Sequence, residues 1–436
     1  MKKIVVVSDL RSPRLTYIAR VIFGSLLNVP YRIDHQYDPS SELPIYYGND
    51  NIEKDKCNMP CHGLLDETGI YEHHIEIKHE KGLPYFFSAV TASENQWPFD
   101  LFTLAFYLVT RYEEYLPFKK DQYQRFPSSQ SLAYRHSFIG KPIIENWVQR
   151  FADWFNAMNH TNLELSGEFT IKPSFDLDLP FAYRFKKWKS YAGLAKDILR
   201  GNWTNGALRL RYFRNNADPF DTYDELRSLC EKGGLHPIYF ILNKYAPPLD
   251  ANHLANSQVL CTLIQSLSDW SEIGIHPSYR SNDHYESFKE EITFIQNCLK
   301  RPIKRSRQHY LRLSHPETYQ RLVSSGIDHD YSMGYPDALG FRASIARPYF
   351  WFDLINETET SLQIHPFMVM DVTLRYYLKQ NPAGALEAVE LVMEETRKVN
   401  GTFSFIWHNS NFSSAYGWTS WKQILEKMVL KTQPAR

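Results

Sequence analysis

The sequence contains no long apolar run, no excess of charge of either sign and few cysteines. A helix that crosses a membrane needs about 20 consecutive apolar residues, and no stretch of the 436 residues provides them. The 49 lysines and arginines balance the 49 aspartates and glutamates, so there is no net positive field to attract nucleic acid. These absences predict a globular chain without a membrane span and without a nucleic-acid partner.

The first residues of the chain also lack the features of an export signal. Two lysines precede a short apolar run that Asp9 and Arg11 interrupt, whereas the apolar core of a signal peptide takes about 7–15 residues. The five cysteines are too few and too scattered for a disulfide scaffold; they are Cys57, Cys61, Cys230, Cys261 and Cys298. We therefore expect a cytoplasmic protein in a reducing compartment.

Three common catalytic motifs are missing. The sequence has no G-x-S-x-G nucleophile elbow, no phosphate-binding P-loop and no G-x-G-x-x-G dinucleotide fingerprint. The content of 43% hydrophobic and 22% charged residues is that of an ordinary globular protein. Aromatic residues reach 15%, which suits both a large core and a cleft in which flat rings stack on sugars.

The first third of the chain alternates strand and helix patterns. Strands are predicted at 3–7, 31–35 and 43–48, and apolar residues at helical spacing predict helices at 14–28, 97–117 and 144–158. The polar stretch 159–168 has turn formers and no periodicity. We therefore predict an N-terminal α/β domain of unknown function over 1–165 and a second domain over 166–436.

The second domain repeats longer strand-and-helix units. Strands are predicted at 169–176, 236–242, 271–277, 305–311, 360–367 and 403–409, with helices of 10–20 residues between most of them. Strands connected by helices pair in parallel, and six or seven such units favour a (β/α) barrel. The predicted fold class is α/β throughout.

Most of these strands end in a side chain that can bind a metal or move a proton. The side chains are Asp176 and Asp178, His276, Arg307 and His309, His365, and His408. A single histidine at such a place is more often structural. In parallel α/β barrels, however, the carboxyl ends of the strands meet at the active site, and the repeated pattern indicates one.

The residue types indicate metal-assisted hydrolysis. Asp176 and Asp178 are two apart on a strand and therefore face the same side. One of them can hold a divalent metal together with His276, while the other takes a proton. A metal with an open position activates water and polarises a carbonyl, and a histidine across the cleft can protonate the leaving group. The substrate would be an amide or an ester.

Four segments resemble, in order, the motifs of the polysaccharide deacetylase (NodB-homology) family: SFDLD, IGIHPSY, RQHY and IWHN. The fuller pattern, with DYSMGYPDALGFRAS, is similar to a Bacteroidetes-type subgroup that has an extra N-terminal domain. The segments LAFYLVTRYEEYLP and RFPSSQSLAY resemble the signature of that extra domain. The resemblance covers almost the whole chain. It implies a distorted (β/α) barrel that removes acetyl groups from sugars with a divalent metal, most often zinc.

The resemblance also implies roles for individual residues. Asp176 matches the catalytic base, Arg307 the arginine that orients it, and His408 the general acid. Asp178 is the nearest match to the metal-binding aspartate, although Leu177 displaces it by one position. His276 matches the first histidine of the H-x-x-x-H metal motif.

The sequence departs from the family where that motif ends. Its second histidine would stand at position 280, where this chain has Arg280, and a cation there would weaken metal binding. His309, where the family usually has proline, is predicted to supply the missing ligand. Tyr310, Arg280, Trp351 and His365 are the predicted substrate-binding residues.

The sequence thus predicts a metal-dependent hydrolase that removes an N- or O-linked acetyl group from a saccharide or glycan precursor, with metal-bound water as nucleophile. Two alternatives stay open. Arg280 favours a non-catalytic glycan-binding or scaffold protein with a degenerate metal site. Related barrels also cleave amides that are not sugars, so an amidohydrolase of that kind is the other alternative.

Overall fold

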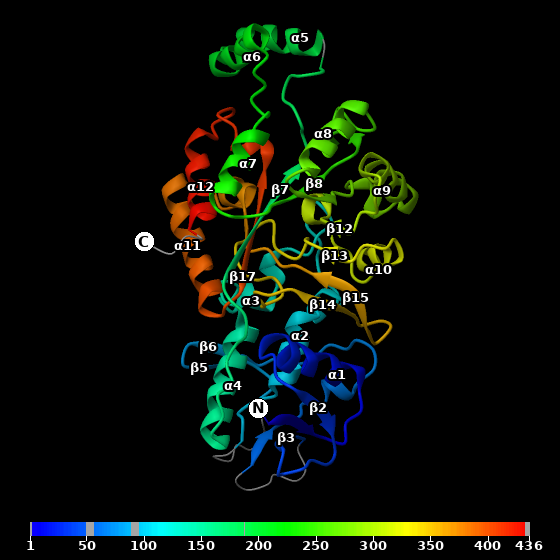
Figure 1. Ribbon diagram of the computed structural model, residues 1–436, viewed down its shortest axis with the longest axis vertical. Helices are drawn as coiled ribbons and strands as arrows, with labels where there is room; N and C mark the ends of the chain where they lie inside the picture. Colours follow the sequence, from blue (N-terminus) through cyan, green and yellow to red (C-terminus); the bar gives the residue numbers. More distant parts are fainter. Residues whose placement is uncertain (1, 49–55, 89–95, 187, 432–436) are drawn as a thin grey trace.

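The computed structural model describes residues 2–48, 56–88, 96–186 and 188–431. Figure 1 shows three parts along the long axis: an N-terminal α/β part at one end, a large sheet flanked by helices in the middle, and a helical hairpin at the other end. In the part of the chain described, no helix is long and apolar enough to cross a membrane.

The N-terminal part contains a small parallel sheet in the order β2-β1-β3-β4. Its strands are β1 (Lys3–Val7), β2 (Tyr31–Asp34), β3 (Glu42–Tyr47) and β4 (Cys57–Met59), and a separate hairpin joins β5 (Lys78–Glu80) to β6 (Leu83–Tyr85). The helices are α1 (Pro13–Ala19), which continues as a π-helical segment over Arg20–Leu26, α2 (Leu101–Val109), α3 (Leu132–Arg135) and α4 (Ile143–Asn159). The central strand β1 is an apolar run, and both of its faces are covered, because the adjacent residues Val5 and Val6 are fully buried.

The helix predicted over 97–117 is much shorter in the structure. Helix α2 ends at Val109, and Arg111 adopts a left-handed backbone conformation with φ 56° before a 3-10 turn over Tyr112–Glu114. Arg111 and Glu114 are buried together as an ion pair of 2.7 Å. Arg111 also donates to the hydroxyl of Tyr335, and Glu114 accepts from Arg342. These contacts with a distant segment, which the apolar periodicity does not encode, hold the turn that follows Val109.

The central sheet has nine strands in the order β14-β15-β13-β12-β11-β8-β7-β17-β16. The strands are β7 (Thr170–Leu177), β8 (Ile238–Ile241), β11 (Glu272–Ile275), β12 (Arg305–Ser306), β13 (His329–Asp330), β14 (Tyr349–Asp353), β15 (Thr358–Ile364), β16 (Val369–Met370) and β17 (Thr402–His408). All neighbours pair in parallel except β14 and β15. The α/β class predicted from the alternation of strands and helices is therefore confirmed.

Helices follow most of the parallel strands. They are α7 (Tyr223–Lys232), α8 (Gln258–Ser268), α9 (Tyr285–Leu299), α10 (Glu317–Ser324), α11 (Pro382–Lys398) and α12 (Lys422–Leu430). A short ribbon, β9 (Tyr245–Ala246) with β10 (Asp250–Ala251), follows β8. Cys261 on α8 and Cys298 on α9 form a disulfide between these two helices. The two cysteines are 37 residues apart, and their pairing was not predicted from the sequence.

Strands β7 and β17 lie side by side although more than two hundred residues separate them. Their register pairs Asp176 with His408 directly. A sheet that curls into a barrel brings its first and last strands together in this way. The two strand ends predicted to share a cleft are therefore adjacent.

The two parts predicted from the sequence share a continuous core. The ring of Tyr17 on α1 packs against Phe106 on α2 and Phe352 on β14, and its hydroxyl donates to the carbonyl of Phe350. The division of the chain at residue 165 remains a prediction, because the apolar cluster runs without interruption from one part into the other.

A helical hairpin separates β7 from α7. It consists of α5 (Trp188–Leu199) and α6 (Trp203–Asn215), and Figure 1 shows it standing away from the central sheet. These two helices were not predicted from the sequence.

Candidate active site

Asp176 and Asp178 lie at the carboxyl end of β7, where their side chains face one cavity of about 310 Å³. The intervening Leu177 is fully buried on the opposite side of the strand, as the alternation of side chains requires. The same cavity is lined by His276, His309 and His408. Residues from four separate segments of the chain thus meet where the parallel strands end.

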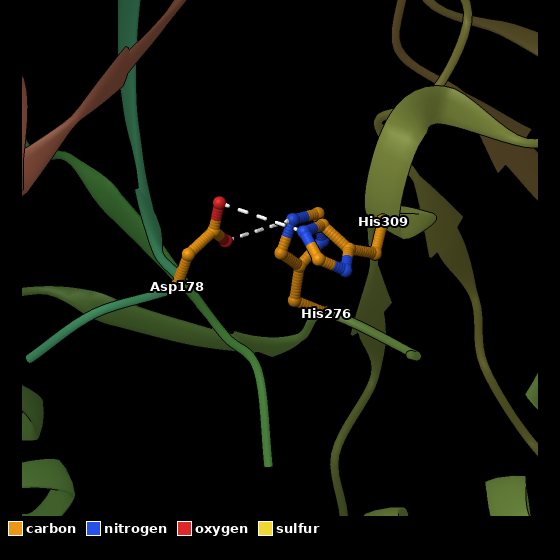
Figure 2. Close-up of side chains that lie close together, drawn as sticks. All are labelled: Asp178, His276 and His309. Carbon is orange, nitrogen blue, oxygen red and sulfur yellow. Dashed lines mark ion pairs between the residues drawn. The ribbon is translucent and has the colours of Figure 1, made fainter. Parts of the chain in front are cut away.

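Asp178, His276 and His309 form a group that could hold a metal ion. One ligand atom from each lies within 4.8 Å of the others. Figure 2 shows the carboxylate facing both imidazoles, with Oδ1 3.4 Å from Nε2 of His276 and Oδ2 3.5 Å from Nε2 of His309. Oδ1 of Asp178 is buried and accepts no hydrogen bond, which is costly for a carboxylate without a cation. The donor set therefore fits a divalent metal.

A hydrogen bond at Nδ1 orients the ring of each histidine, so that Nε2 faces Asp178. Nδ1 of His276 donates to the carbonyl oxygen of Arg307 at 2.6 Å, which directs Nε2 toward Asp178. Nδ1 of His309 donates to Oδ1 of Asp250 at 2.8 Å. Metal-binding histidines are commonly held in this way, because the second hydrogen bond fixes the ring and its tautomer.

The charges around His309 shift two pKa values. Burial alone would lower the pKa of His309, but the carboxylates of Asp178 and Asp250 outweigh it and raise the pKa to about 9. Burial would raise the pKa of Asp178, yet the facing histidines hold it well below its usual value. The cavity thus keeps its central carboxylate in the anionic form that binds cations.

Asp176 is held by a buried arginine. Nη1 of Arg307 donates to Oδ1 of Asp176 at 2.7 Å, Nη2 donates to Ser174 at 2.7 Å, and Nε donates to the carbonyl of Tyr331 at 3.0 Å. The guanidinium also lies 4.2 Å from the centre of the Phe240 ring. The second oxygen, Oδ2, remains 3.7 Å from Nε2 of His276 and is directed toward the metal-capable group.

His408 forms a pair with Asp371 on the other side of the cavity. Nδ1 of His408 donates to Oδ1 of Asp371 at 2.8 Å, and the backbone N–H of His408 donates to Oδ2. Nε2 faces Oδ2 of Asp178 at 3.5 Å. Burial would lower the pKa of His408, but Asp371 and Asp178 raise it to about 10, so the ring carries a proton at neutral pH.

Three of the four predicted substrate-binding residues lie away from this cavity. Arg280 is exposed at the start of a 3-10 turn, and no ion pair between Arg280 and Asp178 exists among the described residues. Trp351 is a core residue of β14 that packs on Tyr319. His365 bonds to His329 and stacks on Tyr331. Only Tyr310 lines the cavity.

Three functional candidates were missed by the sequence analysis: Asp250, Asp371 and Arg125. Asp250 is the first residue of the two-residue strand β10, and Asp371 follows the two-residue strand β16. The only sequence feature that points to Asp371 is its position directly after the apolar segment FMVM. Arg125 comes from the N-terminal part and lines the cavity, which no local pattern could indicate.

The comparison with protein-family models assigns one segment. Residues 4–160 match a family of unknown function, DUF7033. The match covers the N-terminal part and ends before β7, so it contains none of the metal-capable residues. A comparison with curated protein sequences finds no match.

Solved structures resemble about 60% of the chain. A protein from Mycobacterium smegmatis, provisionally named a polysaccharide deacetylase, has 13% identity and a TM-score of 0.39, over 61% of this chain and 84% of its own. The polysaccharide deacetylase Bc1974 from Bacillus cereus has 12% identity and a TM-score of 0.31, over 60% and 86%. BA3943 from Bacillus anthracis, a CE4 family pseudoenzyme, has 8% identity and a TM-score of 0.31, over 60% of each chain. At these identities the likeness concerns the fold and not the activity.

Proposed function

We propose that this chain is a metal-dependent hydrolase that removes an acetyl group from a saccharide. The observation that carries the proposal is the meeting of three units in one cavity: the group Asp178, His276 and His309, the pair of Asp176 with Arg307, and the pair of His408 with Asp371. A carboxylate and a histidine that flank a metal site are the parts that hydrolysis of an amide or ester requires.

Asp178, His276 and His309 would hold the divalent ion. Two imidazoles and one carboxylate form a donor set that zinc accepts. When bound, such an ion polarises the substrate carbonyl and lowers the pKa of a coordinated water toward 7. A set of three protein donors leaves room for water and substrate, which is typical of catalytic rather than structural sites.

The remaining residues would move the protons. Asp176 takes the proton from the attacking water through Oδ2, because Oδ1 is bound by Arg307. His408 gives a proton from Nε2 to the departing amine or alkoxide, because Nδ1 is bound by Asp371. The raised pKa of His408, about 10, supplies the protonated form that a general acid needs.

The walls of the cavity support a saccharide as substrate. Tyr310 and Tyr377 line the cavity, with Leu179, Leu249 and Val372 among its apolar lining residues. Aromatic and apolar faces beside a few polar groups suit the mixed surface of a sugar ring. The sequence motifs that resemble the polysaccharide deacetylase family point to the same substrate class, and a glycan precursor in the cytoplasm is our proposal for its source.

A non-catalytic glycan-binding protein is the second candidate. Arg280 in place of a histidine favoured it, because a cation at the metal position would displace the ion. The exposed position of Arg280 weakens that argument, and His309 stands where a third donor is needed. A protein that binds acetylated saccharides but releases no acetate would establish this alternative.

The experiment combines metal analysis with acetate release from a panel of N- and O-acetylated saccharides. We expect about one divalent ion per chain and loss of acetate release after chelation, with recovery on adding metal. Asp176→Asn and His408→Ala should each lower kcat by about 10²-fold or more and keep the metal. Asp178→Asn should lose the metal.

A matched control is His236→Ala, because His236 is exposed at the opposite ends of the strands and its side chain is 61% accessible. That variant should retain both metal and activity. Wild-type protein that binds no divalent ion, or Asp176→Asn with near wild-type activity, would overturn the proposal.

A further inference from the structure

The hairpin of α5 and α6 carries large apolar side chains at its tip. Leu199, the last residue of α5, is 86% exposed, and Trp203, the first residue of α6, is 71% exposed. Ile198 beside them is 45% exposed. Single exposed apolar residues are common on proteins. Three exposed apolar residues together at the end of a projecting hairpin indicate a surface that binds another protein or a membrane.

The exposed face of α6 continues this pattern along the helix. Trp203, Leu210, Arg211 and Arg214 are all exposed, and spacings of seven, eight and eleven residues place them on one side. Apolar groups thus lie beside cations on a single face. This arrangement is typical of helices that lie in the interface between a bilayer and water.

The charge of the hairpin differs sharply from that of the whole chain. Over residues 193–216 the bases are Lys196, Arg200, Arg209, Arg211 and Arg214, and the only acid is Asp197. Five bases less one acid leave a net charge of +4, whereas the complete sequence has a net charge of zero. Asp197 is already bound by Nε of Arg209 at 2.6 Å. The other four cations of residues 193–216 can bind an anionic surface.

The neck of the hairpin is fixed. The carboxylate of Asp218 accepts the backbone N–H groups of Ala182, Tyr183 and Arg184, each at 2.8 Å, and that of Phe220 at 3.0 Å. The two chain segments that enter and leave the hairpin are therefore joined to each other. A surface on the tip would be held at a defined orientation to the body.

The hairpin also lies at the end of the sheet that carries the cavity. It begins shortly after Asp178, at the carboxyl end of β7. Leu179 lines the cavity and belongs to the same apolar cluster as Leu208 and Tyr212 of α6. Figure 1 shows α5 and α6 beyond the end of the central sheet, on the side opposite the N-terminal part.

We propose that the hairpin docks the protein on an anionic lipid bilayer, with Leu199 and Trp203 entering the interfacial layer and the arginines binding the head groups. The proposal rests on charge complementarity and on the exposed apolar tip, and it does not depend on the proposed hydrolase activity. Tryptophan prefers the membrane interface, and each basic residue near an anionic surface adds to binding. Docking would hold the mouth of the cavity near the membrane.

The test is co-sedimentation of the full chain with vesicles. We expect binding to vesicles of phosphatidylcholine with about one third phosphatidylglycerol, little binding to pure phosphatidylcholine, and release at high salt, because screening shortens the reach of the charges. The variant Arg200→Gln, Arg211→Gln, Arg214→Gln should bind about a hundredfold more weakly. The variant Leu199→Ser, Trp203→Ser should bind about tenfold more weakly.

Two control variants change the same residue types elsewhere. Leu391→Ser removes a leucine that is 66% exposed on α11, and Arg301→Gln removes an exposed arginine of the loop after α9. Both should bind vesicles like the wild type. Since all substituted side chains are exposed, unchanged thermal unfolding would show that each variant is folded.

Three outcomes would overturn the proposal. The first is wild-type protein that does not bind anionic vesicles. The second is equal binding by wild type and by the two hairpin variants. The third is a wild-type dimer that the tip variant converts to monomers without any binding to vesicles, which would make a second copy of this chain the occupant of the tip.

Discussion

Nη1 of Arg125 donates a hydrogen bond of 2.9 Å to the carbonyl oxygen of Tyr310, across 185 residues of sequence. Tyr310 and Leu311 both have left-handed backbone conformations, with φ 60° and 56°, and each costs on the order of 1 kcal/mol or more for a residue with a side chain. They follow His309 directly. The N-terminal part thus holds the strained turn that presents a metal-capable histidine to the cavity.

We predict that Arg125→Met lowers both metal affinity and kcat, each by about tenfold. Arg125 also donates to the carboxylate of Asp121 and to the hydroxyl of Tyr377. Its replacement therefore removes the hydrogen bonds that connect Tyr310 to these two residues. A hydrogen bond from a charged donor contributes about 1.5–3 kcal/mol, which sets the scale of the effect. Metal titration and acetate release measure it.

The control for this prediction is Arg135→Met, because Arg135 is an exposed arginine of the same N-terminal part. It should behave as wild type. If Arg125→Met keeps wild-type metal affinity and activity, the central sheet and its loops hold the turn without Arg125, which would contradict this prediction.

Asp371→Asn should lower kcat by about 10²–10⁴-fold while the metal content stays unchanged. The amide keeps the shape of the carboxylate but loses the negative charge that raises the pKa of His408 and fixes its ring. KM should change little, because Asp371 is fully buried and does not touch the cavity. Asp328→Asn is the control, because the side chain of Asp328 is 45% exposed and lies away from the cavity; equal activity of the two variants would contradict the pairing.

The sequence predicted those parts of the site that follow strong local patterns. Asp176 and Asp178 were found because a buried strand of alternating side chains ends in two aspartates. The expectation that one of these aspartates lies beside His276 agrees with the 3.4 Å between Oδ1 of Asp178 and Nε2 of His276. His309 was proposed as a third donor because position 280 lacks a histidine.

The residues that act on these side chains could not be predicted in the same way. Asp250 begins one strand of two residues and Asp371 follows another, and such strands are too short for a periodic pattern. Arg125 acts on the cavity from the other part of the chain. Trp351 was assigned to the cleft from residue type alone, and the packing of β14 against α10 places it in the core instead.

Glu114→Gln should lower the free energy of unfolding by about 3–5 kcal/mol. Oε1 of Glu114 accepts from Nε of Arg111 at 2.7 Å and from Nε of Arg342 at 2.9 Å, which joins α2 to the loop before β14. The attraction of Arg342 and Arg111 outweighs burial and lowers the pKa of Glu114. Removing its charge leaves two buried guanidinium groups without their main partner.

Chemical denaturation measures this loss. Glu286→Gln is the control, because the side chain of Glu286 is 81% exposed and a surface ion pair contributes little. A loss below about 0.5 kcal/mol in Glu114→Gln, the range of ordinary surface substitutions, would show that the network does not connect the two parts energetically.

Glu145→Gln should stabilise the protein, and increasingly so as the pH rises. Glu145 lies in the first turn of α4, where Oε1 accepts the backbone N–H of Ala346 at 2.7 Å and Oε2 is buried without a partner. Burial raises its pKa from 4.5 to about 7. The folded protein therefore holds a proton there that the unfolded chain releases above pH 4.5.

The pH dependence follows from these two values. Below pH 4.5 both states are protonated and Glu145 costs nothing. Between pH 4.5 and 7 the unfolded chain binds fewer protons, so the stability of the wild type falls as the pH rises. Above pH 7 the loss of stability is complete, and the rise in the pKa of Glu145 corresponds to a loss of roughly 3 kcal/mol in the free energy of unfolding. Glutamine keeps the acceptor for Ala346 and carries no charge at any pH.

Thermal unfolding of wild type and variant at pH 5 and pH 8.5 provides the measurement. The difference in Tm should be small at pH 5 and should favour Glu145→Gln clearly at pH 8.5. The same substitution at the exposed Glu164, just after α4, should give a difference that does not depend on pH. A Tm difference for Glu145→Gln that is equal at both pH values would mean that the folded protein does not retain this proton, because a fixed change in packing cannot vary with pH.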